Sequence, residues 1–133
     1  MRFPVVLLWI NAALFVVFGV GFIIAPALLS QVITGATPGT TSALIDLRAT
    51  YGGMALGIGI FWGYCARRPG TLRIGLISSL LVLLGIVLGR LVGMTVDGSP
   101  NTFMLVLLAA ELLFIGLIAL ALRRTSETTV KRM

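Results

Sequence analysis

Four long runs of apolar residues dominate the chain, and prolines, glycines or basic residues mark their ends. The runs extend from about Val5 to Ala25, Ala43 to Ala66, Leu72 to Val96 and Thr102 to Leu122. A helix of roughly 20 residues crosses a hydrocarbon core about 30 Å thick, and each run is long enough. Helices satisfy their own backbone hydrogen bonds in lipid, and the runs lack the short alternating segments of a membrane barrel. The pattern predicts one all-α integral membrane domain over residues 1–133, a four-helix transmembrane bundle.

A short amphipathic helix is expected between the first two spans. Pro26 suits the first turn of a helix, and the apolar residues that follow fall on one side of it: Leu28, Leu29, Val32 and Ile33. Such a helix would lie along the membrane interface. Gly35–Ser42 is rich in Thr, Gly and Pro and is expected to be a loop. The polar residues 125–133 are expected to form a frayed tail.

The composition of the chain excludes several function classes. Of its 133 residues 59% are hydrophobic and 11% are charged, whereas a soluble domain has about 25% charged residues. The net charge of +6 does not indicate nucleic-acid binding, because the basic residues form short clusters at the ends of apolar runs. The single cysteine excludes an intramolecular disulfide, and the lack of histidine removes the commonest general base and metal ligand. We therefore expect no enzyme activity, no cofactor and no metal.

The placement of the basic residues predicts the orientation of the chain. If the chain crosses four times, eight of the ten basic residues fall at one face: Arg2, Arg67, Arg68, Arg73, Arg123, Arg124, Lys131 and Arg132. Basic residues close to span ends favour the cytoplasm, which predicts cytoplasmic N and C termini. The alternative is a cleaved signal peptide ending near Ala25-Pro26-Ala27. Its apolar stretch exceeds the about 7–15 residues of a signal core, which favours a span.

Glycines four residues apart recur in the second and third spans. The motifs are Gly53-x-x-x-Gly57, Gly59-x-x-x-Gly63 and Gly85-x-x-x-Gly89-x-x-x-Gly93. In lipid, helices associate through close backbone approach and van der Waals contact, which such a glycine face permits. We expect the second and third spans to pack against each other through these faces, and a homodimer seam is the alternative.

Four charged residues interrupt the apolar runs: Asp46, Arg48, Arg90 and Glu111. A charge at the centre of a membrane helix costs about 2.5–3.5 kcal/mol on insertion scales. These side chains are therefore expected to face one another, water or a ligand.

Depth arithmetic predicts one ion pair. The third and fourth spans form a hairpin whose turn centres near Ser99 and Pro100. Arg90 lies ten residues before Pro100, and Glu111 lies eleven residues after it. At 1.5 Å per residue both side chains lie about 15 Å below the turn. The sequence therefore predicts that Arg90 and Glu111 touch.

Arg48 is expected about 7 Å inside the outer end of the second span. Its candidate partners are the carboxylates of Asp46, Asp97 and Glu111. Tyr51 follows three residues later and shares the same helix face. One interpretation of this polar cluster is structural, a lock on helix register. The other is a pocket that opens at the outer face and holds a ligand head group, since Arg48 and Arg90 together suit a carboxylate or phosphate. A proton or ion path through Glu111 is a third interpretation.

Four other polar or aromatic residues allow simpler interpretations. Trp9 and Trp62 are expected to be aromatic anchors at the cytoplasmic interface. Asn11 is expected to be a buried polar group in the first span. Cys65 is expected to be an inert packing residue, with acylation as the alternative.

Two strings of the sequence resemble one family. Leu47-Arg48-Ala49-Thr50-Tyr51-Gly52-Gly53 and Gly89-Arg90, followed by Asp97-Gly98-x-Pro100 and Glu111, are similar to the bacterial membrane family called domain of unknown function 4345. The resemblance covers essentially the whole chain. It implies a four-helix protein of the bacterial inner membrane, DoxX-like in general arrangement, and it brings no catalytic residues.

We therefore expect a non-enzymatic membrane protein that binds an anionic amphiphile or metabolite at the polar cluster. An accessory subunit of a larger respiratory or photosynthetic complex is the second expectation, and a proton-coupled carrier is the third. The expected partners are the lipid bilayer, a lipid or anionic small molecule, and a larger complex or a second copy of the chain, without nucleic acid.

Overall fold

The chain folds into helices joined by short turns. The computed structural model describes residues 2–130, with side chains described as far as Thr125. The helices are α1 (Arg2–Ile24), α2 (Pro26–Thr34), α3 (Thr41–Leu47), the π-helical stretch η1 (Arg48–Met54), α4 (Ala55–Arg67), α5 (Pro69–Val96) and α6 (Thr102–Val130). In the described residues four stretches are long and apolar enough to cross a membrane: α1, α3 through α4, α5, and α6 as far as Thr125. The predicted all-α fold class with four membrane-spanning helices is confirmed.

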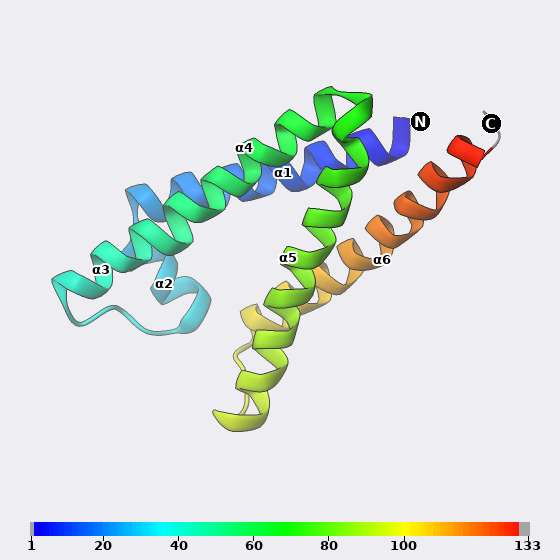
Figure 1. Cartoon of the computed structure of the whole chain (residues 1–133). Helices are drawn as coiled ribbons and strands as arrows, with labels where there is room; N and C mark the ends of the chain where they lie inside the picture. Colours follow the sequence, from blue (N-terminus) through cyan, green and yellow to red (C-terminus); the bar gives the residue numbers. More distant parts are fainter. Residues whose placement is uncertain (1, 131–133) are drawn as a thin grey trace.

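The four spans associate as two pairs (Figure 1). α4 runs alongside α1, and α5 and α6 form an antiparallel hairpin. The start of α1 and the end of α6 lie at one end of the molecule, as does the turn between α4 and α5. We call this the arginine end, because it carries Arg2, Arg67, Arg68, Arg73, Arg123 and Arg124. The opposite end holds α2 and the turn between α5 and α6, and we call it the α2 end. The two pairs diverge toward the α2 end.

The second span consists of three consecutive pieces. Thr40 caps α3, because its side-chain oxygen accepts a hydrogen bond from the Ala43 backbone N–H at 3.2 Å. The π-helical stretch η1 follows, and α4 then continues without a turn. Such π-helical stretches are rare and often occur at functional sites. Here η1 includes Arg48 and Gly52, at the point where the span meets α1.

The short helix predicted between the first two spans is confirmed as α2. Pro26 stands in its first turn, and Gly35 ends it with a φ of 79°, a left-handed conformation that favours glycine. A loop without helix then extends to residue 40. The side-chain amide of Asn101 donates to the carbonyl oxygen of Ile33 at 3.0 Å. This bond ties α2 to the start of α6 and so joins the two helix pairs at their diverging end.

Glycines bring α1 and the second span into close contact. A Cβ on Gly19 would lie 2.6 Å from the Leu56 backbone nitrogen and 2.8 Å from the Gly52 carbonyl oxygen. A Cβ on Gly59 would lie 2.8 Å from the Ala12 carbonyl oxygen. Real Cβ atoms do not approach backbone atoms so closely, so only glycine fits at these positions. The two backbones therefore pack as closely as small residues allow in lipid.

The prediction that the third span packs through its glycine face was wrong. A Cβ on Gly85 or Gly89 meets nothing within 4 Å, and one on Gly93 meets only the Asp97 carboxylate at 3.6 Å. In the second span Gly59 and Gly63 face α1 instead, as does Gly52, whereas Gly53 and Gly57 of the other predicted motif do not. A glycine motif specifies a flat helix face but not the neighbour that occupies it, and α1 carries small residues, such as Gly19, that complete the contact.

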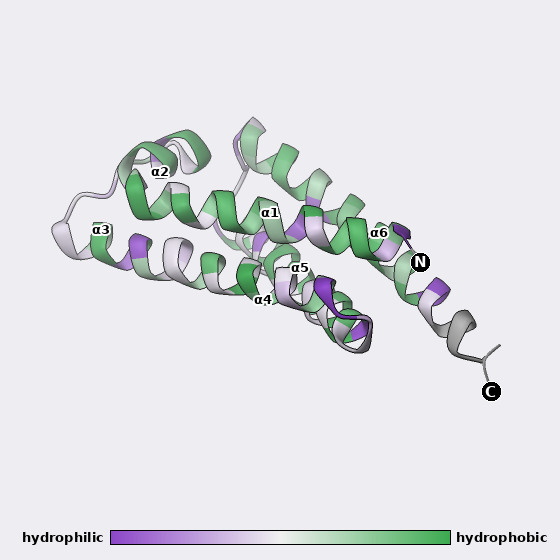
Figure 2. Cartoon of the chain, turned by 90° about the horizontal axis from the view of Figure 1, so that it is seen from above, coloured by the Kyte–Doolittle hydropathy of each residue, from purple (hydrophilic) through white to green (hydrophobic). Residues whose placement is uncertain are grey.

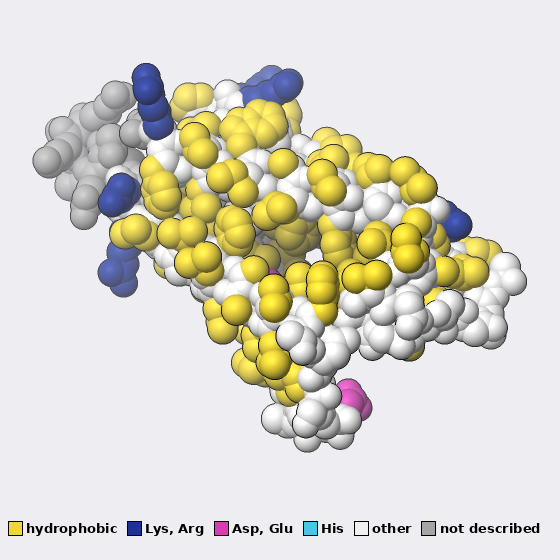
Figure 3. Space-filling model, turned by 180° about the vertical axis from the view of Figure 1, so that it is seen from behind, with side chains coloured by type: hydrophobic (Ala, Val, Ile, Leu, Met, Phe, Trp, Pro, Cys, Tyr) yellow, Lys and Arg dark blue, Asp and Glu magenta, His cyan; other side chains and the backbone are white. Residues whose placement is uncertain are grey.

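The outer surface of the bundle is apolar. Figure 2 shows hydrophobic residues along all the spans, with hydrophilic residues concentrated near the turns and the ends. In Figure 3 hydrophobic side chains cover most of one face of the molecule, and the Lys and Arg side chains gather mainly at one end. Large apolar side chains such as Val17, Leu81 and Leu113 are more than half exposed. This surface agrees with lipid as the surrounding solvent.

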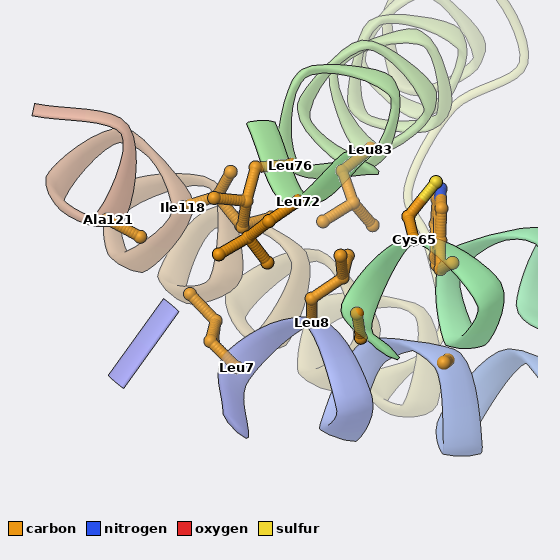
Figure 4. Packing of buried hydrophobic residues seen from close by; sticks show 11 residues of the cluster. Leu7, Leu8, Cys65, Leu72, Leu76, Leu83, Ile118 and Ala121 are labelled. Carbon is orange, nitrogen blue, oxygen red and sulfur yellow. The ribbon is translucent and has the colours of Figure 1, made fainter. Parts of the chain in front are cut away.

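The closed core lies in the half of the bundle toward the arginine end. Its central residues come from four helices: Leu7 and Leu8 from α1, Cys65 from α4, Leu72, Leu76 and Leu83 from α5, and Ile118 and Ala121 from α6 (Figure 4). Cys65 is buried in this cluster, in agreement with the predicted packing role. The predicted buried polar group in the first span is also confirmed, since Asn11 is buried and its amide donates to the Leu7 carbonyl oxygen at 3.2 Å.

Trp62 is not an interfacial anchor, contrary to the prediction. The side chain is fully buried, and its indole N–H donates to the Ser78 hydroxyl at 3.0 Å. Phe15 packs on it with ring centroids 4.5 Å apart. Proximity to a span end does not distinguish an inward-facing tryptophan from an outward-facing one. Trp9, in contrast, is exposed, and the Arg67 guanidinium lies 5.8 Å from its ring centroid.

The last helix extends further than predicted. α6 continues to Val130, through residues expected to be a polar tail. From Thr102 to Val130 the chain contains no proline, so nothing in the sequence forces the helix to stop at the end of its apolar run. The remainder of the predicted tail, residues 131–133, lies outside the described residues.

Candidate functional site

Arg90 on α5 and Glu111 on α6 form an ion pair. The Arg90 Nε–H is shared between the two carboxylate oxygens of Glu111, at 3.1 Å from Oε1 and 3.0 Å from Oε2. The contact predicted from matched depth along the hairpin is confirmed. The pairing lowers the cost of placing two charges inside membrane helices, because each charge now faces the opposite one.

The pair lies on the inward faces of its two helices. Along α5, Leu76, Leu83 and Val87 are buried, and Arg90 follows one turn later on the same face. Along α6, the buried Ile118 lies seven residues, or two turns, after Glu111. The side chains of Arg90 and Glu111 are nevertheless 19% and 13% exposed. The core therefore opens where the charged pair begins.

A hollow accounts for this opening. Figure 3 shows the apolar face hollowed near its middle, with hydrophobic side chains around the rim and an acidic side chain visible inside. Compared with Figure 1, the hollow lies between α1 and α6, where the two helix pairs diverge, with α5 behind it. We call this feature the central hollow. It faces the membrane side of the bundle, because the surface around it is apolar.

The Arg90 guanidinium has donors that no described residue accepts. Its Nε is engaged by Glu111, while its two terminal amino groups form no hydrogen bond with any residue that the structure describes. Each amino group carries two N–H donors. The Arg90 side chain is 19% exposed, so these donors are open to an acceptor from outside the described residues.

Arg48 does not pair with a carboxylate. Its Nη1 donates to the carbonyl oxygen of Ile23, and the Ile24 carbonyl oxygen lies 3.4 Å from the same nitrogen. Both carbonyls belong to the last turn of α1, whose final carbonyl groups have no partner within the helix. The cation also stabilises the negative end of the helix dipole. The predicted partners of Arg48 were wrong because a helix C-terminus from another span supplied the acceptors.

The other predicted cluster residues lie apart from the ion pair. Tyr51 is half-exposed, and its ring packs against Phe22 of α1 with centroids 5.2 Å apart. Asp46 and Asp97 are exposed at the α2 end, and neither forms an ion pair within the described residues. Only Arg90 and Glu111 are brought together from the predicted set, while Arg48 and Tyr51 serve the contact between the second span and α1.

Sequence reasoning missed Asn101, which helps to define the α2 end. Its side-chain oxygen accepts from the Met104 backbone N–H at 2.8 Å and so caps α6, while its amide group reaches α2. The signal was present, because asparagine just before an apolar run is typical of a helix N-cap. The contact with Ile33, 68 residues away, had no signal in the sequence.

The described residues hold no cluster of three or more His, Cys, Asp or Glu side chains that could bind a metal ion. The molecule is a multi-pass α-helical membrane protein. This class is defined by the four membrane-spanning helices, the apolar exterior and the internal ion pair of the described residues. The chain belongs to the family described as Domain of unknown function (DUF4345), whose model matches residues 5–122. No protein with a curated description matches the chain, and no solved structure matches it.

Proposed function

We propose that this protein binds an anionic amphiphile taken from the membrane, with the head group on Arg90 and the apolar part in the central hollow. The observation that carries the proposal is the state of the Arg90 guanidinium, whose terminal amino groups have no acceptor among the described residues. The apolar rim of the hollow supports an apolar tail. The role is binding, without a catalytic step.

The chemistry of guanidinium favours an oxyanion as the head group. Its planar fork of N–H donors matches the geometry of carboxylate and phosphate oxygens. α5 ends at Val96, six residues after Arg90, so the helix rise puts Arg90 about 9 Å inside the end of its helix and within the outer half of a hydrocarbon core about 30 Å thick. An amphiphile whose head group leaves the interface and descends into the hollow fits that depth better than a water-soluble metabolite does.

The proposed location is the bacterial inner membrane, with both termini in the cytoplasm. The basis is the asymmetry of the basic residues, which gather at the arginine end and favour the cytoplasmic side. The central hollow would then open in the outer half of the bilayer.

The test is native mass spectrometry of the protein purified in mild detergent, with extraction of bound small molecules. The variants are the charge-neutral double variant Arg90→Gln/Glu111→Gln and, as a matched control, Arg73→Gln at the arginine end. We expect an acidic amphiphile to accompany the wild-type protein and the Arg73→Gln variant but not the double variant. The same bound molecules in all three proteins would refute the proposal.

A second candidate function is that of a subunit in a larger membrane assembly, including a homo-oligomer. It is supported by the glycine face of α5, at which a Cβ on Gly85 or Gly89 would meet nothing within 4 Å. Such a face suits close approach of a helix from another chain. We expect Gly89→Leu to abolish co-purification of a partner, while Gly116→Leu, at an equally open position on α6, retains it. Migration of the wild-type protein as a lone monomer would count against this candidate.

A further inference from the structure

The ion pair between Arg90 and Glu111 is electrically balanced. One guanidinium cation and one carboxylate anion face each other through the shared Arg90 Nε–H. A bound anion would add a third charge to this site. The way in which the site accommodates that charge determines how binding depends on pH.

Few other charges are close enough to balance an added anion. α6 packs against α5, α1 and α2. The only charged residue of α1 is Arg2, at the arginine end, and α2 contains none. The other charged residues of α5 and α6 lie near helix ends: Arg73, Arg123, Arg124 and Glu127. Asp97 directly follows the last residue of α5.

The second span does not supply a cation that could balance the bound anion either. Arg48 is engaged by the last carbonyl oxygens of α1. Asp46, also near the α2 end, is itself an anion and is exposed. Among the described side chains that remain, Arg90 is the only charged group in contact with Glu111.

Resting on the proposed function, we infer that binding of an anion at Arg90 is coupled to the uptake of one proton by Glu111. Before binding, the charges of Arg90 and Glu111 sum to zero. After binding, the anion takes the place of the carboxylate as the counter-ion of Arg90, and the Glu111 carboxylate accepts a proton from water to become a carboxylic acid. The charges again sum to zero, and no bond of the ligand forms or breaks.

The geometry suits this exchange. The terminal amino groups of Arg90, which no described residue engages, receive the head group without first releasing Glu111, because Nε alone holds the carboxylate. Once protonated, Glu111 gains an O–H donor that can point at the head group. The alternative, two anions beside one cation in a site of low dielectric, is disfavoured by like-charge repulsion. Anion and proton would therefore enter and leave this site together.

The test uses hexadecane sulfonate, an anionic amphiphile that stays ionised at all relevant pH values. The full chain is reconstituted in nanodiscs of zwitterionic phosphatidylcholine. Probe binding and the pH change of a weakly buffered solution are measured between about pH 5 and about pH 8. We expect one proton taken up for each probe bound, and an affinity that falls by up to about tenfold per pH unit where Glu111 is ionised. Hexadecanol, the uncharged control, should cause no proton uptake.

Variants separate the two proposals. In Glu111→Gln we expect probe binding that is tight at every pH and takes up no proton, whereas Arg90→Gln/Glu111→Gln should not bind the probe. Binding to the wild-type protein without proton uptake would overturn the coupling and leave the binding site standing. If the wild-type protein binds no probe at any pH, the binding site is refuted and the coupling with it. The number of protons that the wild-type protein takes up for each bound probe tests the coupling even if Glu111→Gln does not fold.

Discussion

At the scale of single residues, the two arginines Arg48 and Arg90 are held by two different kinds of acceptor. Arg90 meets the carboxylate of Glu111, and Arg48 meets the last carbonyl oxygens of α1. The Arg90 side chain is only 19% exposed, and its contact lowers the cost of a guanidinium inside an apolar bundle, whereas Arg48 is exposed. The two contacts differ in how they can be tested. A substitution removes the Glu111 carboxylate, but no substitution removes a backbone carbonyl of α1.

The Arg90–Glu111 pair should show strong energetic coupling. Each single variant, Arg90→Gln or Glu111→Gln, leaves one charge without its partner and should lower the free energy of unfolding by about 2–3 kcal/mol. The double variant leaves no charge and should cost clearly less than the sum of the two. Thermal unfolding in detergent, evaluated as a double-mutant cycle, measures this coupling. Simple additivity of the two single effects would contradict the pairing.

Arg48 should act through hydrogen bonds to α1 and not through a carboxylate. We expect Arg48→Gln to lower the free energy of unfolding by about 1–2 kcal/mol, because it removes a charged donor from the C-terminus of α1. Asp46→Asn is the matched control and should change the stability by less than about 0.5 kcal/mol, since Asp46 is exposed and forms no ion pair in the described residues. A larger loss from Asp46→Asn than from Arg48→Gln would reverse this assignment.

At the scale of helices, glycine determines which spans approach each other. Gly59 faces the backbone of α1, and Gly57 faces open space on the same helix. Gly59→Ala should therefore destabilise the protein by about 1–3 kcal/mol, because its Cβ would overlap the Ala12 carbonyl oxygen. Gly57→Ala should be neutral or slightly stabilising, since alanine is the better helix former. Unfolding of the two variants in parallel checks this, and equal effects would mean that α1 and α4 are not in close contact.

The sequence predicted the spans and the ion pair well, but it did not predict which groups the other polar residues and the glycines contact. Apolar runs determine the spans directly, and the matched depth of Arg90 and Glu111 required only a hairpin and the helix rise. The acceptor of Arg48 is a backbone group, which no side-chain pattern reveals. The neighbour of each glycine face depends on how four helices pack, and so the role of Gly85 and Gly89 was assigned to the wrong contact.

The candidate site was predictable in its chemistry but not in its shape. The charged residues were evident as interruptions of apolar runs, and two of them do meet. The central hollow depends on the angle between the two helix pairs, which is set by close packing of α1 on α4 and by the core at the arginine end. Helix crossing angles arise from side-chain packing over whole interfaces, and hydropathy along one chain does not determine them.

At the scale of the whole molecule, the two ends differ in charge and in packing. The arginine end holds the closed core, and three arginines there lie over aromatic rings, among them Arg68 over Tyr64 at 4.8 Å. The α2 end holds the diverging helices, tied together by the bond between Asn101 and Ile33.

The orientation proposed from this asymmetry can be measured with reporters in a bacterial host. A green fluorescent protein fused after residue 133 should fluoresce, because it folds in the cytoplasm, and alkaline phosphatase fused at the same place should be inactive. A phosphatase inserted at Gly98, in the turn between α5 and α6, should be active because that turn should lie outside. The opposite pattern of activities would invert the proposed topology.

The position of the central hollow has a consequence for any measured affinity. The hollow opens between α1 and α6 into an apolar surface, so the proposed ligand would reach it by lateral diffusion within the bilayer. Occupancy then follows the mole fraction of the ligand among the lipids, not its concentration in water. Lengthening the tail of a ligand would raise its apparent affinity through partitioning alone, by about 0.8 kcal/mol for each methylene group, with no new contact to the protein. Ligands of different chain length should therefore be compared at equal membrane content.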